Sequence, residues 1–549
     1  MEKCTLANSC LWSLTNEFYA HSGQKAWIKT EMEKIDAKAP PVPFYMTSNP
    51  LIAHRWAAIA YAYYLYTQNV RPGSPFYLFE LGAGTARFAY LFIQRFLHLL
   101  KTGSHDPEKA HPIKIVLCDL SDQVIQHWSN SVLLAPYFKS GLLESAEVLI
   151  DDKFEKIVTS GGKEISRQNP LDGFGMFMGG YLLDTLKHDA FWVDPQSRGK
   201  LLFNVQLGED NTPSNSALSK LMNAQITYER SEPEQMTNQE IASLCDHYQK
   251  KIKYDPSRTV GLDFSIPVDA LSLTQKLKSF CTEGTLVLTG DQGFASFDEL
   301  IDEKEITFGR HGTISLPVNY DAYRFIEAKR GSRVLMSQQA RHKFVECVLL
   351  HNSSASTAGK GDSLPASALE GSPAHVLLQQ SIQNILDDFD VENYWQLVEQ
   401  LHYPNNQNIT VSLDMLYLLL KLGKSDPINF FFWMPSIFEQ LAGATKGQKR
   451  QWQVLLMDIA NAFYLVEDSE VDLLLNAGAS CLTAELHDAA ITFLGKGTRL
   501  AATRAEFFFN LGLCYLQKHD KQNAALHFIQ AEKIDANFSL EARGLLNPS

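Results

Sequence analysis

The sequence predicts an α/β fold, in which a mostly parallel sheet carries helices on both faces, followed by an all-α region. Two observations support this prediction. Before residue 350, short apolar runs of strand length, such as FYLFEL, IKIVLCDL and GTLVLTG, alternate with amphipathic stretches. After residue 374, helical patterns such as LDMLYLLLKLG and WQVLLMDIANAFYLV follow one another without strand-like runs.

Bulk composition limits the class of protein. A chain of 549 residues is too long for one hydrophobic core, so we expect several domains. Hydrophobic residues make up 45% and charged residues 20%, which is typical of soluble globular proteins. The net charge of −13, without a basic patch, predicts no nucleic-acid partner.

Cysteine spacing and hydropathy indicate the compartment. The 8 cysteines form neither a C-x-x-C pair nor a zinc-type cluster, so we expect reduced thiols in a cytoplasmic protein. Neither a signal-peptide apolar region nor a run of 18 apolar residues occurs, so we expect no association with a membrane.

The clearest break in composition is HNSSASTAGKGDSLPASALEGSPA, residues 351–374, which is rich in Ser, Ala and Gly and has no aromatic residue. Such a stretch is typical of a flexible linker. The sequence therefore predicts an α/β domain over 1–350 with its core at about 40–345, a linker over 351–374, and a helical domain over 375–549.

A glycine turn follows the first strand of the α/β domain. The run FYLFEL (76–81) delivers Glu80 to the carboxyl edge of the sheet, where open α/β sheets bind ligands. Gly82 and Gly84 would let the backbone approach a ligand closely, and Glu80 would attract a cationic or polar group. An acid here is a poor neighbour for phosphate. The pattern favours a ligand with a cationic group, although a glycine-bearing strand-to-helix turn without a ligand has the same sequence.

The stretch E80-L-G82-A-G84-T-A86 resembles motif I of the class I S-adenosylmethionine-dependent methyltransferases, with Ala86 at the third glycine position. The next strand, IKIVLC, ends in Asp119, where that family places an acid that binds both ribose hydroxyls. The resemblance implies a Rossmann-like methyltransferase sheet and S-adenosyl-L-methionine as cofactor. A structural acid at a helix N-terminus is the alternative for Asp119.

A third acid follows the run AEVLI (146–150), which we expect to be a strand that ends at Asp151 and Asp152. The resemblance implies that an acid near this point contacts the adenine amino group, and Asp151 is the candidate. A solvated loop acid is the alternative.

The fourth strand, FGMFMGG, and the residues after it are similar to a segment of the MidA-like branch, Asn-Glu-aromatic-aromatic-Asp-Ala-Leu-Pro. Aligned on Asp184, that Asn falls on Gly180, the Glu on Tyr181 and the Pro on Lys187. The resemblance implies that Gly180 borders the cofactor. Tyr181 and Asp184 are the catalytic candidates, since a tyrosine or carboxylate could orient or deprotonate an arginine or amine acceptor.

Other segments extend the resemblance. FYMTSNPLIAHRWA (44–57) is similar to the family's Thr-Ser lead-in, so Thr47 and Ser48 could line the cofactor pocket and Asn49-Pro50 could begin a helix. The strand TLVLTGDQG (285–293) carries Asp291 near its end. His311 is a candidate base, with a structural histidine as the alternative.

The C-terminal region contains a repeat. Five residues stand at the spacings of a tetratricopeptide repeat's small and aromatic positions: Gly512, Tyr515, Ala524, Phe528 and Ala531. Residues 34 positions earlier, Gly478 and Ala490, match two of them. The resemblance implies protein or peptide binding by stacked helices. An ordinary helical hairpin domain is the alternative.

Together these features predict a methyltransferase that acts on a protein acceptor, with arginine as one candidate, recruited by the C-terminal repeats. The alternative is an assembly or adaptor protein that binds S-adenosylmethionine without catalysis, which the departures at Gly180 and Ala86 favour. A nicotinamide-dependent oxidoreductase fits less well, because Arg87 replaces the last glycine of G-x-G-x-x-G.

Overall fold

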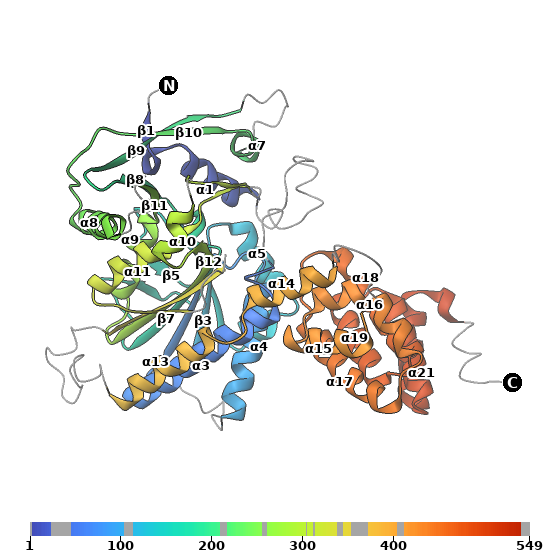
Figure 1. The fold of residues 1–549 in the computed structure, drawn as a ribbon. Helices are drawn as coiled ribbons and strands as arrows, with labels where there is room; N and C mark the ends of the chain where they lie inside the picture. The colour runs from blue at the N-terminus through green and yellow to red at the C-terminus, as the bar shows by residue number, and fades with distance from the viewer. Residues whose placement is uncertain are drawn as a thin grey trace. The chain divides into compact units, whose positions relative to one another are not determined.

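The computed structural model describes residues 3–22, 45–103, 113–208, 217–254, 261–303, 305–310, 313–337, 344–352, 372–402 and 411–539 (Figure 1). Backbone contacts divide the chain into two compact units. The first comprises residues 1–47, 55–89 and 93–388, and the second comprises residues 48–54, 90–92 and 389–549.

An eight-stranded sheet forms the centre of the first unit. Its strand order is β16 (Arg333–Met336), β17 (Phe344–Asn352), β12 (Gly284–Phe294), β7 (Phe174–Gly180), β2 (Phe76–Leu81), β3 (Ile113–Asp119) and β4 (Leu143–Glu147), and β15 (Val318–Asn319) pairs with β12. The five strands from β12 to β4 run parallel, whereas β17 is antiparallel to both of its neighbours. The predicted, mostly parallel α/β sheet is confirmed.

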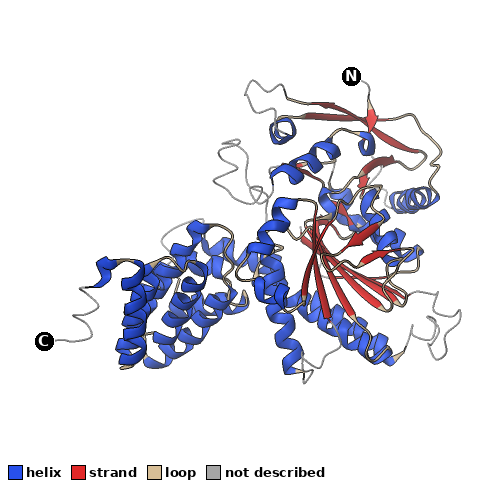
Figure 2. Ribbon diagram, turned by 180° about the vertical axis from the view of Figure 1, so that it is seen from behind, coloured by secondary structure: helices blue, strands red, loops and turns tan. Residues whose placement is uncertain are grey.

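Helices cover both faces of this sheet (Figure 2). On one face lie α3 (Pro50–Val70) and α4 (Arg87–Thr102), whose rings contact β2: Phe76 lies 5.4 Å from Tyr64 and 6.4 Å from Phe96 between ring centroids. The other face packs against α8 (Gln239–Tyr254), α9 (Val268–Lys278), α10 (Phe297–Asp302) and α11 (Tyr320–Lys329).

Strand periodicity determines which face each side chain of β2 joins. Phe79 and Leu81 belong to the core under α8, α9 and α11, so Phe76, Leu78 and Glu80 point to the face of α3 and α4. Because β3 pairs in parallel with Glu80 opposite Leu117, Asp119 shares the face of Glu80.

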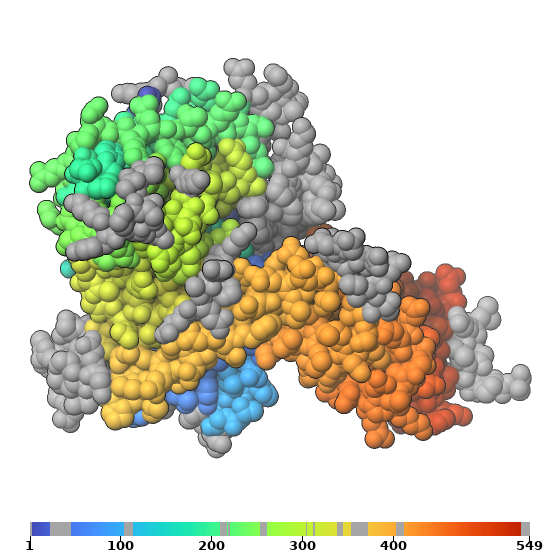
Figure 3. Space-filling model, viewed as in Figure 1, coloured from blue at the N-terminus to red at the C-terminus, as the bar shows by residue number. Residues whose placement is uncertain are grey.

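A second, five-stranded sheet is a feature that the sequence did not predict. It contains β1 (Cys4–Thr5), β9 (Arg198–Gln206), β8 (Asp189–Val193), β11 (Leu262–Ile266) and β10 (Gln225–Arg230). Helix α1 (Leu11–Ser22) packs on it through Leu11, Trp12 and Phe18. The green surface of Figure 3, which includes β9 and β10, is continuous with the yellow-green surface of later residues.

The remaining short elements of the first unit connect these layers. They are α5 (Asp122–Asn130), α6 (Ala135–Lys139), α7 (Ala217–Met222), the 3-10 helices Leu6–Asn8 and Leu183–Thr185 (η3), and two small hairpins, β5 (Lys156–Val158) with β6 (Glu164–Ser166) and β13 (Gly309–Arg310) with β14 (Ile314–Ser315).

Two element boundaries can be compared with their predictions. The strand expected at 146–150 is wrong by three residues, because β4 pairs with β3 from Leu143 and the pairing stops at Glu147 opposite the last residue of β3. The helix start at Asn49-Pro50 is confirmed, since α3 begins at Pro50 and Asn49 Oδ1 accepts the Ile52 N–H at 3.1 Å. His311 and most of the expected linker, 353–371, lie outside the described residues.

Helix α13 (Pro373–Leu386) belongs to the first unit, although the sequence groups it with the helical region. Its contacts give the reason. Gln383 Nε2 donates to the carbonyl oxygen of Met336 on β16 at 2.9 Å, and the ring of His375 lies 5.8 Å from that of Tyr66 on α3.

The second unit is helical throughout its described residues after 388. Its helices are α14 (Val391–His402), α15 (Leu413–Leu422), α16 (Pro427–Leu441), α17 (Lys446–Ala462), α18 (Val471–Thr483), α19 (His487–Leu500), α20 (Ala505–Gln517) and α21 (Lys521–Ile534). The predicted all-α region is therefore confirmed as a fold class. None of the helices in the described part of the chain is long and apolar enough to cross a membrane.

Two helix pairs at the end of this unit repeat the same packing. A Cβ on Gly478 in α18 would lie 2.5 Å from Leu494 in α19, and one on Gly512 in α20 would lie 2.5 Å from Phe528 in α21. Each glycine therefore admits a large side chain from the next helix. Both members of the second contact stand 34 positions after those of the first, which is the period found in the sequence.

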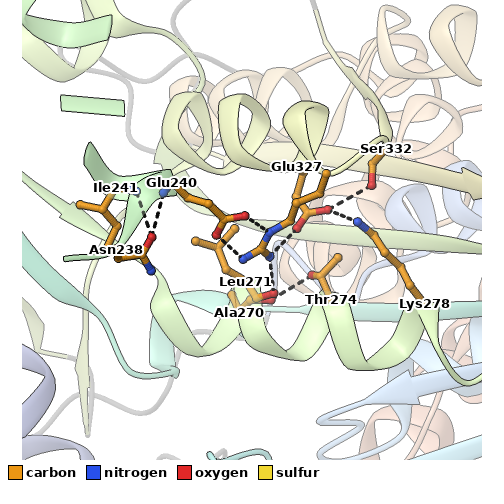
Figure 4. Close-up of polar contacts among 10 residues, drawn as sticks. Asn238, Glu240, Ile241, Ala270, Leu271, Thr274, Lys278, Glu327 and Ser332 are labelled. Atoms are coloured by element: carbon orange, nitrogen blue, oxygen red, sulfur yellow. Dashed lines mark hydrogen bonds and ion pairs between the residues drawn. The ribbon is translucent and has the colours of Figure 1, made fainter. Parts of the chain in front are cut away.

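A buried ionic network joins helices α8, α9 and α11 (Figure 4). Glu327 on α11 is fully buried and accepts hydrogen bonds from Lys278 Nζ, from Ser332 Oγ at 3.0 Å and from Arg330 Nη1 at 3.0 Å. Arg330 also forms two 2.7 Å hydrogen bonds with the carboxylate of Glu240 on α8. Two carboxylates and two cations thus balance one another at the junction of three helices, and Glu327 contacts both cations.

We predict that Glu327→Ala lowers the free energy of unfolding by about 3–5 kcal/mol, because it leaves Lys278 and Arg330 partly uncompensated in a buried site. Urea unfolding followed by circular dichroism would measure the change. As a control, Glu164→Ala removes the exposed pair with Lys156 and should cost less than about 1 kcal/mol. Equal effects of both variants would contradict the prediction.

Candidate functional site

The order of the parallel strands reverses at one point of the larger sheet. From β2 the chain continues to β3 and β4 on one side, and then returns to β7 and β12 on the other side of β2. The carboxyl ends of β2 and β7 therefore flank a topological switch point, where open α/β sheets bind ligands. Glu80 and Gly82 lie at the end of β2 and Gly180 at the end of β7, while Asp119 ends the neighbouring strand β3.

The turn after β2 has the geometry that glycine favours. Gly82 and Gly84 have φ angles of 72° and 52°, and Ala86, the residue before α4, has 59°. The N–H groups of Gly82 and Ala83 both donate to the carbonyl oxygen of Cys118 on β3, at 2.9 and 3.0 Å. Left-handed backbone at two glycines therefore folds the turn over the end of the neighbouring strand.

Asp119 is tied to this turn. Its Oδ2 accepts the N–H of Gly84 at 3.0 Å, and its Oδ1 accepts the N–H of Ser121 at 3.2 Å. Burial raises the pKa of Asp119, and the backbone N–H groups partly offset this rise. Trp128 of α5 donates from Nε1 to the carbonyl oxygen of Gly84 at 2.8 Å. The carboxylate is thus oriented, and each oxygen keeps a lone pair for a further donor.

Glu80, unlike Asp119, receives no hydrogen bond from a backbone N–H group of the described residues. Its side chain is 7% exposed, and within the described part of the chain its carboxyl group forms no hydrogen bond or ion pair. Burial and the charge of Asp119 raise the pKa of Glu80 well above its usual range. We call Glu80 and Asp119 the first acid pair. A cation placed beside it would supply the missing partner of Glu80.

Asp151 is placed differently from the first acid pair. It lies in a turn beyond β4, is partly exposed, and its Oδ1 accepts the N–H of Lys153 at 2.8 Å. Nearby Asp152 is exposed. The Lys153 N–H is the side-chain hydrogen-bond partner that the structure gives Asp151, and its carbonyl oxygen accepts the N–H of Phe154 in the same turn.

Gly180 lies under two side chains of the lead-in segment and helix α3. A Cβ at this position would lie 2.9 Å from Thr47 Cβ, 3.0 Å from Thr47 Cγ2 and 3.7 Å from Trp56 Cη2. The paired residue of β12, Gly290, is covered by Trp56 and Phe344. Thr47 and Trp56 therefore occupy the space that an asparagine would need at position 180.

Tyr181 has a left-handed backbone with φ of 49°, which is uncommon for a residue with a bulky side chain. Its N–H donates to the carbonyl oxygen of Gly290 at 2.9 Å, and its ring lies edge-on to Phe344 with 5.8 Å between centroids. Such strain is held in place by surrounding contacts and clusters at functional sites.

Asp184, in the 3-10 helix η3, forms a carboxyl pair with Asp291 of β12, which we call the second acid pair. Their side chains are 7% and 0% exposed. Burial, the charge of Asp291 and a hydrogen bond between the two carboxyl groups raise the pKa of Asp184 well above its usual range. Burial also raises the pKa of Asp291, to about 6.

Tyr19 of α1 is buried close enough to both acid pairs for the charges of Asp184 and Asp119 to act on it. Burial, followed by the charges of Asp184 and Asp119, raises the pKa of its phenol far above the usual value. Helix α1 is held at this edge by a 3.4 Å hydrogen bond from Ser121 Oγ to the carbonyl oxygen of Ala20. The charges of one acid from each pair therefore act on the same phenol.

Leu182 packs against the glycine turn and the end of β7. Its Cδ2 would lie 2.7 Å from a Cβ on Gly179, and its Cδ1 would lie 3.5 Å from a Cβ on Gly82. A ligand that approaches the glycine turn would therefore contact Leu182.

The structure thus brings together Glu80, Gly82, Gly84 and Asp119, and it places Gly180, Tyr181 and Asp184 on the adjoining strand end. Sequence reasoning missed Tyr19 and the pairing of Asp291 with Asp184. Asp291 lies near the carboxyl end of a predicted strand, so its position in that strand could have identified it as a candidate site residue. Tyr19 carried no local signal, because α1 reaches the site only through tertiary packing.

Comparison with known proteins gives distant structural likenesses. No family model and no curated protein matches the chain. An uncharacterized ACR, COG1565 superfamily protein from Burkholderia thailandensis has a TM-score of 0.35 at 12% identity, over 62% of this chain and 93% of that chain. A COG1565 superfamily member from the same organism, bound to S-adenosyl-homocysteine, has a TM-score of 0.35 at 12% identity, over 63% and 94%.

A third solved structure, the plantazolicin methyltransferase BpumL in complex with SAH, has a TM-score of 0.27 at 8% identity, over 62% of this chain and 95% of that chain. Likenesses this distant identify neither a family nor an activity for the chain.

We predict that Gly180→Ala lowers the free energy of unfolding by about 1–3 kcal/mol, because the added methyl group overlaps Thr47. Thr47→Gly should recover part of this loss in a double-mutant cycle measured by urea unfolding. Gly495→Ala is the matched control, since its Cβ would meet nothing within 4 Å and alanine stabilises the middle of a helix by about 1 kcal/mol. Additive effects of Gly180→Ala and Thr47→Gly would contradict the placement of Thr47.

Proposed function

We propose that the chain is an S-adenosylmethionine-dependent methyltransferase whose cofactor binds at the switch point between β2 and β7. The observation that carries this proposal is Glu80, a buried carboxyl group that has no partner among the described residues and lies two residues before a glycine turn. A ligand with an ammonium group and a sulfonium complements this site, because both groups are cationic and neither resembles phosphate.

The described residues fit this cofactor. Gly82 and Gly84 would admit its amino-acid chain, and Glu80 would bind its ammonium group. Asp119 keeps lone pairs for two ribose hydroxyls while the Gly84 and Ser121 N–H groups hold it in place. When bound, the cofactor supplies an electrophilic methyl carbon on sulfur, so the protein's task is mainly to align an acceptor.

Tyr181 and Asp184 are the residues that would orient the acceptor. Tyr181 lies directly after the last residue of β7, and its strained backbone fixes the direction of the side chain. Asp184 follows three residues later in η3. An acceptor on a protein, with arginine as one candidate, is part of the proposal, as is a cytoplasmic location.

We predict that Glu80→Gln and Asp119→Asn each weaken binding of S-adenosylhomocysteine by about 1–3 kcal/mol, the scale of a charge-assisted hydrogen bond. Isothermal titration calorimetry would measure the affinities. Glu80→Gln should leave stability unchanged, because the raised pKa makes the unliganded carboxyl group resemble a neutral amide. Asp152→Asn, an exposed acid of the same unit, is the control. Unchanged affinity in both site variants would remove the cofactor from this position.

An assembly or adaptor role is the second candidate, and the packing at Gly180 favours it, because Thr47 and Trp56 fill the space of the MidA-like branch's asparagine. On this alternative the chain binds S-adenosylmethionine without transfer and works through its helices. Binding of the cofactor without methylation of any protein in a cell extract would support it.

We propose that the tetratricopeptide-like helices of the second unit bind a protein or peptide. One exposed apolar stripe is formed by α15, where Met415, Leu418 and Leu422 are 48, 56 and 42% exposed at helical spacing. Exposure of large apolar side chains to water is unfavourable, and a partner that covers them lowers the free energy of the complex.

We predict that Leu418→Glu weakens capture of such a partner by about tenfold or more, since it replaces apolar burial with a charge. The full chain, with a photo-crosslinking residue at position 415, would be mixed with extract and the crosslinked yield quantified. Leu526→Glu, at an equally exposed leucine of α21, is the control. Equal yields from both variants would exclude α15 from the interface.

A further inference from the structure

Both polar groups of the Gly84 backbone are held by side chains of one segment, β3 and the helix α5 that follows it. The N–H of Gly84 donates to Asp119 Oδ2 at 3.0 Å, and its carbonyl oxygen accepts the indole Nε1–H of Trp128 at 2.8 Å. Both of these side chains are buried. The conformation of Gly84 therefore depends on two tertiary contacts and not on the turn alone.

Gly84 needs such contacts because its own backbone is permissive. It has a φ of 52° and no Cβ, so the peptide bond between Gly84 and Thr85 could rotate at little steric cost. Among the described residues, the donor to the Gly84 carbonyl oxygen is the Trp128 indole. A trans peptide directs its C=O and N–H to opposite sides, so this hydrogen bond also directs the Thr85 N–H away from Trp128.

The position of Trp128 follows from the pattern of α5. This helix of 9 residues buries Val124 and Trp128, which stand four positions apart and so share one face. The residue before the helix, Ser121, donates its N–H to Asp119 Oδ1 at 3.2 Å. One short helix thus connects the contact of Asp119 with the contact of Trp128, and its regular geometry fixes the spacing between them.

The chemistry of an indole suits this position. Its N–H donates but the ring nitrogen accepts no hydrogen bond, so Trp128 cannot take a donor away from Asp119. The indole is also uncharged. A lysine or arginine at the same place would attract the carboxylates of the first acid pair and compete with a cationic ligand.

We propose that Trp128 is a positioning residue of the glycine-turn site: its indole N–H holds the peptide bond after Gly84 in one orientation, and Gly84 in turn holds the carboxylate of Asp119. This inference rests on the proposed function, in which Asp119 binds the ribose hydroxyls of the cofactor. Trp128 acts through Gly84 and does not touch the ligand.

Trp12 provides a matched control. Its indole N–H also donates to a backbone carbonyl oxygen, that of Leu6, at 2.8 Å and in a buried position. The change from tryptophan to phenylalanine therefore removes the same kind of hydrogen bond at both positions and keeps a buried ring. The two hydrogen bonds differ in that only the one from Trp128 reaches the glycine turn.

The first measurement requires no ligand. Amide hydrogen exchange of the full chain would be followed by mass spectrometry of peptides that cover residues 82–86. Trp128→Phe should make exchange in this turn about threefold faster or more, because Gly84 loses one of its two contacts. Trp12→Phe should leave exchange in the turn unchanged.

The second measurement is calorimetric titration of the full chain with S-adenosylhomocysteine. Trp128→Phe should weaken binding by about three- to tenfold, the scale of one hydrogen bond, and Trp12→Phe by less than about twofold. Benzothienylalanine at position 128, in which sulfur replaces the N–H at almost constant shape, should reproduce the loss even where Trp128→Phe impairs folding. With Asp119→Ala already present, Trp128→Phe should weaken binding by less than about twofold.

The outcomes separate this inference from the proposed function. Equal effects of Trp128→Phe and Trp12→Phe on affinity, or unchanged exchange of residues 82–86 in the benzothienylalanine variant, would overturn the role of Trp128. Independent effects of Trp128→Phe and Asp119→Ala would overturn it as well. Failure of S-adenosylhomocysteine to bind the wild-type chain would instead reject the proposed cofactor, while the exchange measurement would still test the hold of Trp128 on Gly84.

Discussion

Burial of like-charged carboxyl groups at one sheet edge is the constraint on which this site depends. An ionised carboxylate taken out of water without a partner costs several kcal/mol. Two effects reduce this free-energy cost in the chain. Asp119 is compensated by backbone N–H groups of the glycine turn and of Ser121. Glu80 has no donor among the described residues, and burial and the charge of Asp119 raise its pKa well above the usual range, which disfavours the charged form until a cation binds beside it.

The second acid pair follows the same physics on the other face of the sheet. The side chain of Asp291 points to the face of the sheet that packs against α11, where Tyr320 donates to it. Glu80 and Asp119 point to the opposite face, towards α3 and α4. Both η3 and the turn after β2 follow strands that flank the switch point, and the charges of Asp184 and Asp119 both act on the phenol of Tyr19 in α1. Tyr181, between β7 and η3 in the chain, has a left-handed backbone. Such strain persists where the surrounding contacts hold it in place.

The parallel strands and their acids were predictable from local pattern. FYLFEL, IKIVLC and FGMFMGG are buried apolar runs that end in turn residues, and each became the expected strand within a residue or two. The strand expected at 146–150 was displaced because its register depends on β3, a partner that the sequence does not reveal. The second sheet was missed because its strands pair across long insertions, and α13 joined the first unit through contacts with β16 and α3.

By itself the sequence determined the alternation of strands and helices, the glycine turn after Glu80 and the helical texture beyond residue 374, since each depends on residues close together in the chain. Tertiary structure alone decided which acids meet. Asp184 and Asp291 are 107 residues apart, and Tyr19 reaches them from a helix near the N-terminus. Contacts of this kind depend on strand order and on how neighbouring elements pack, so no local pattern encodes them.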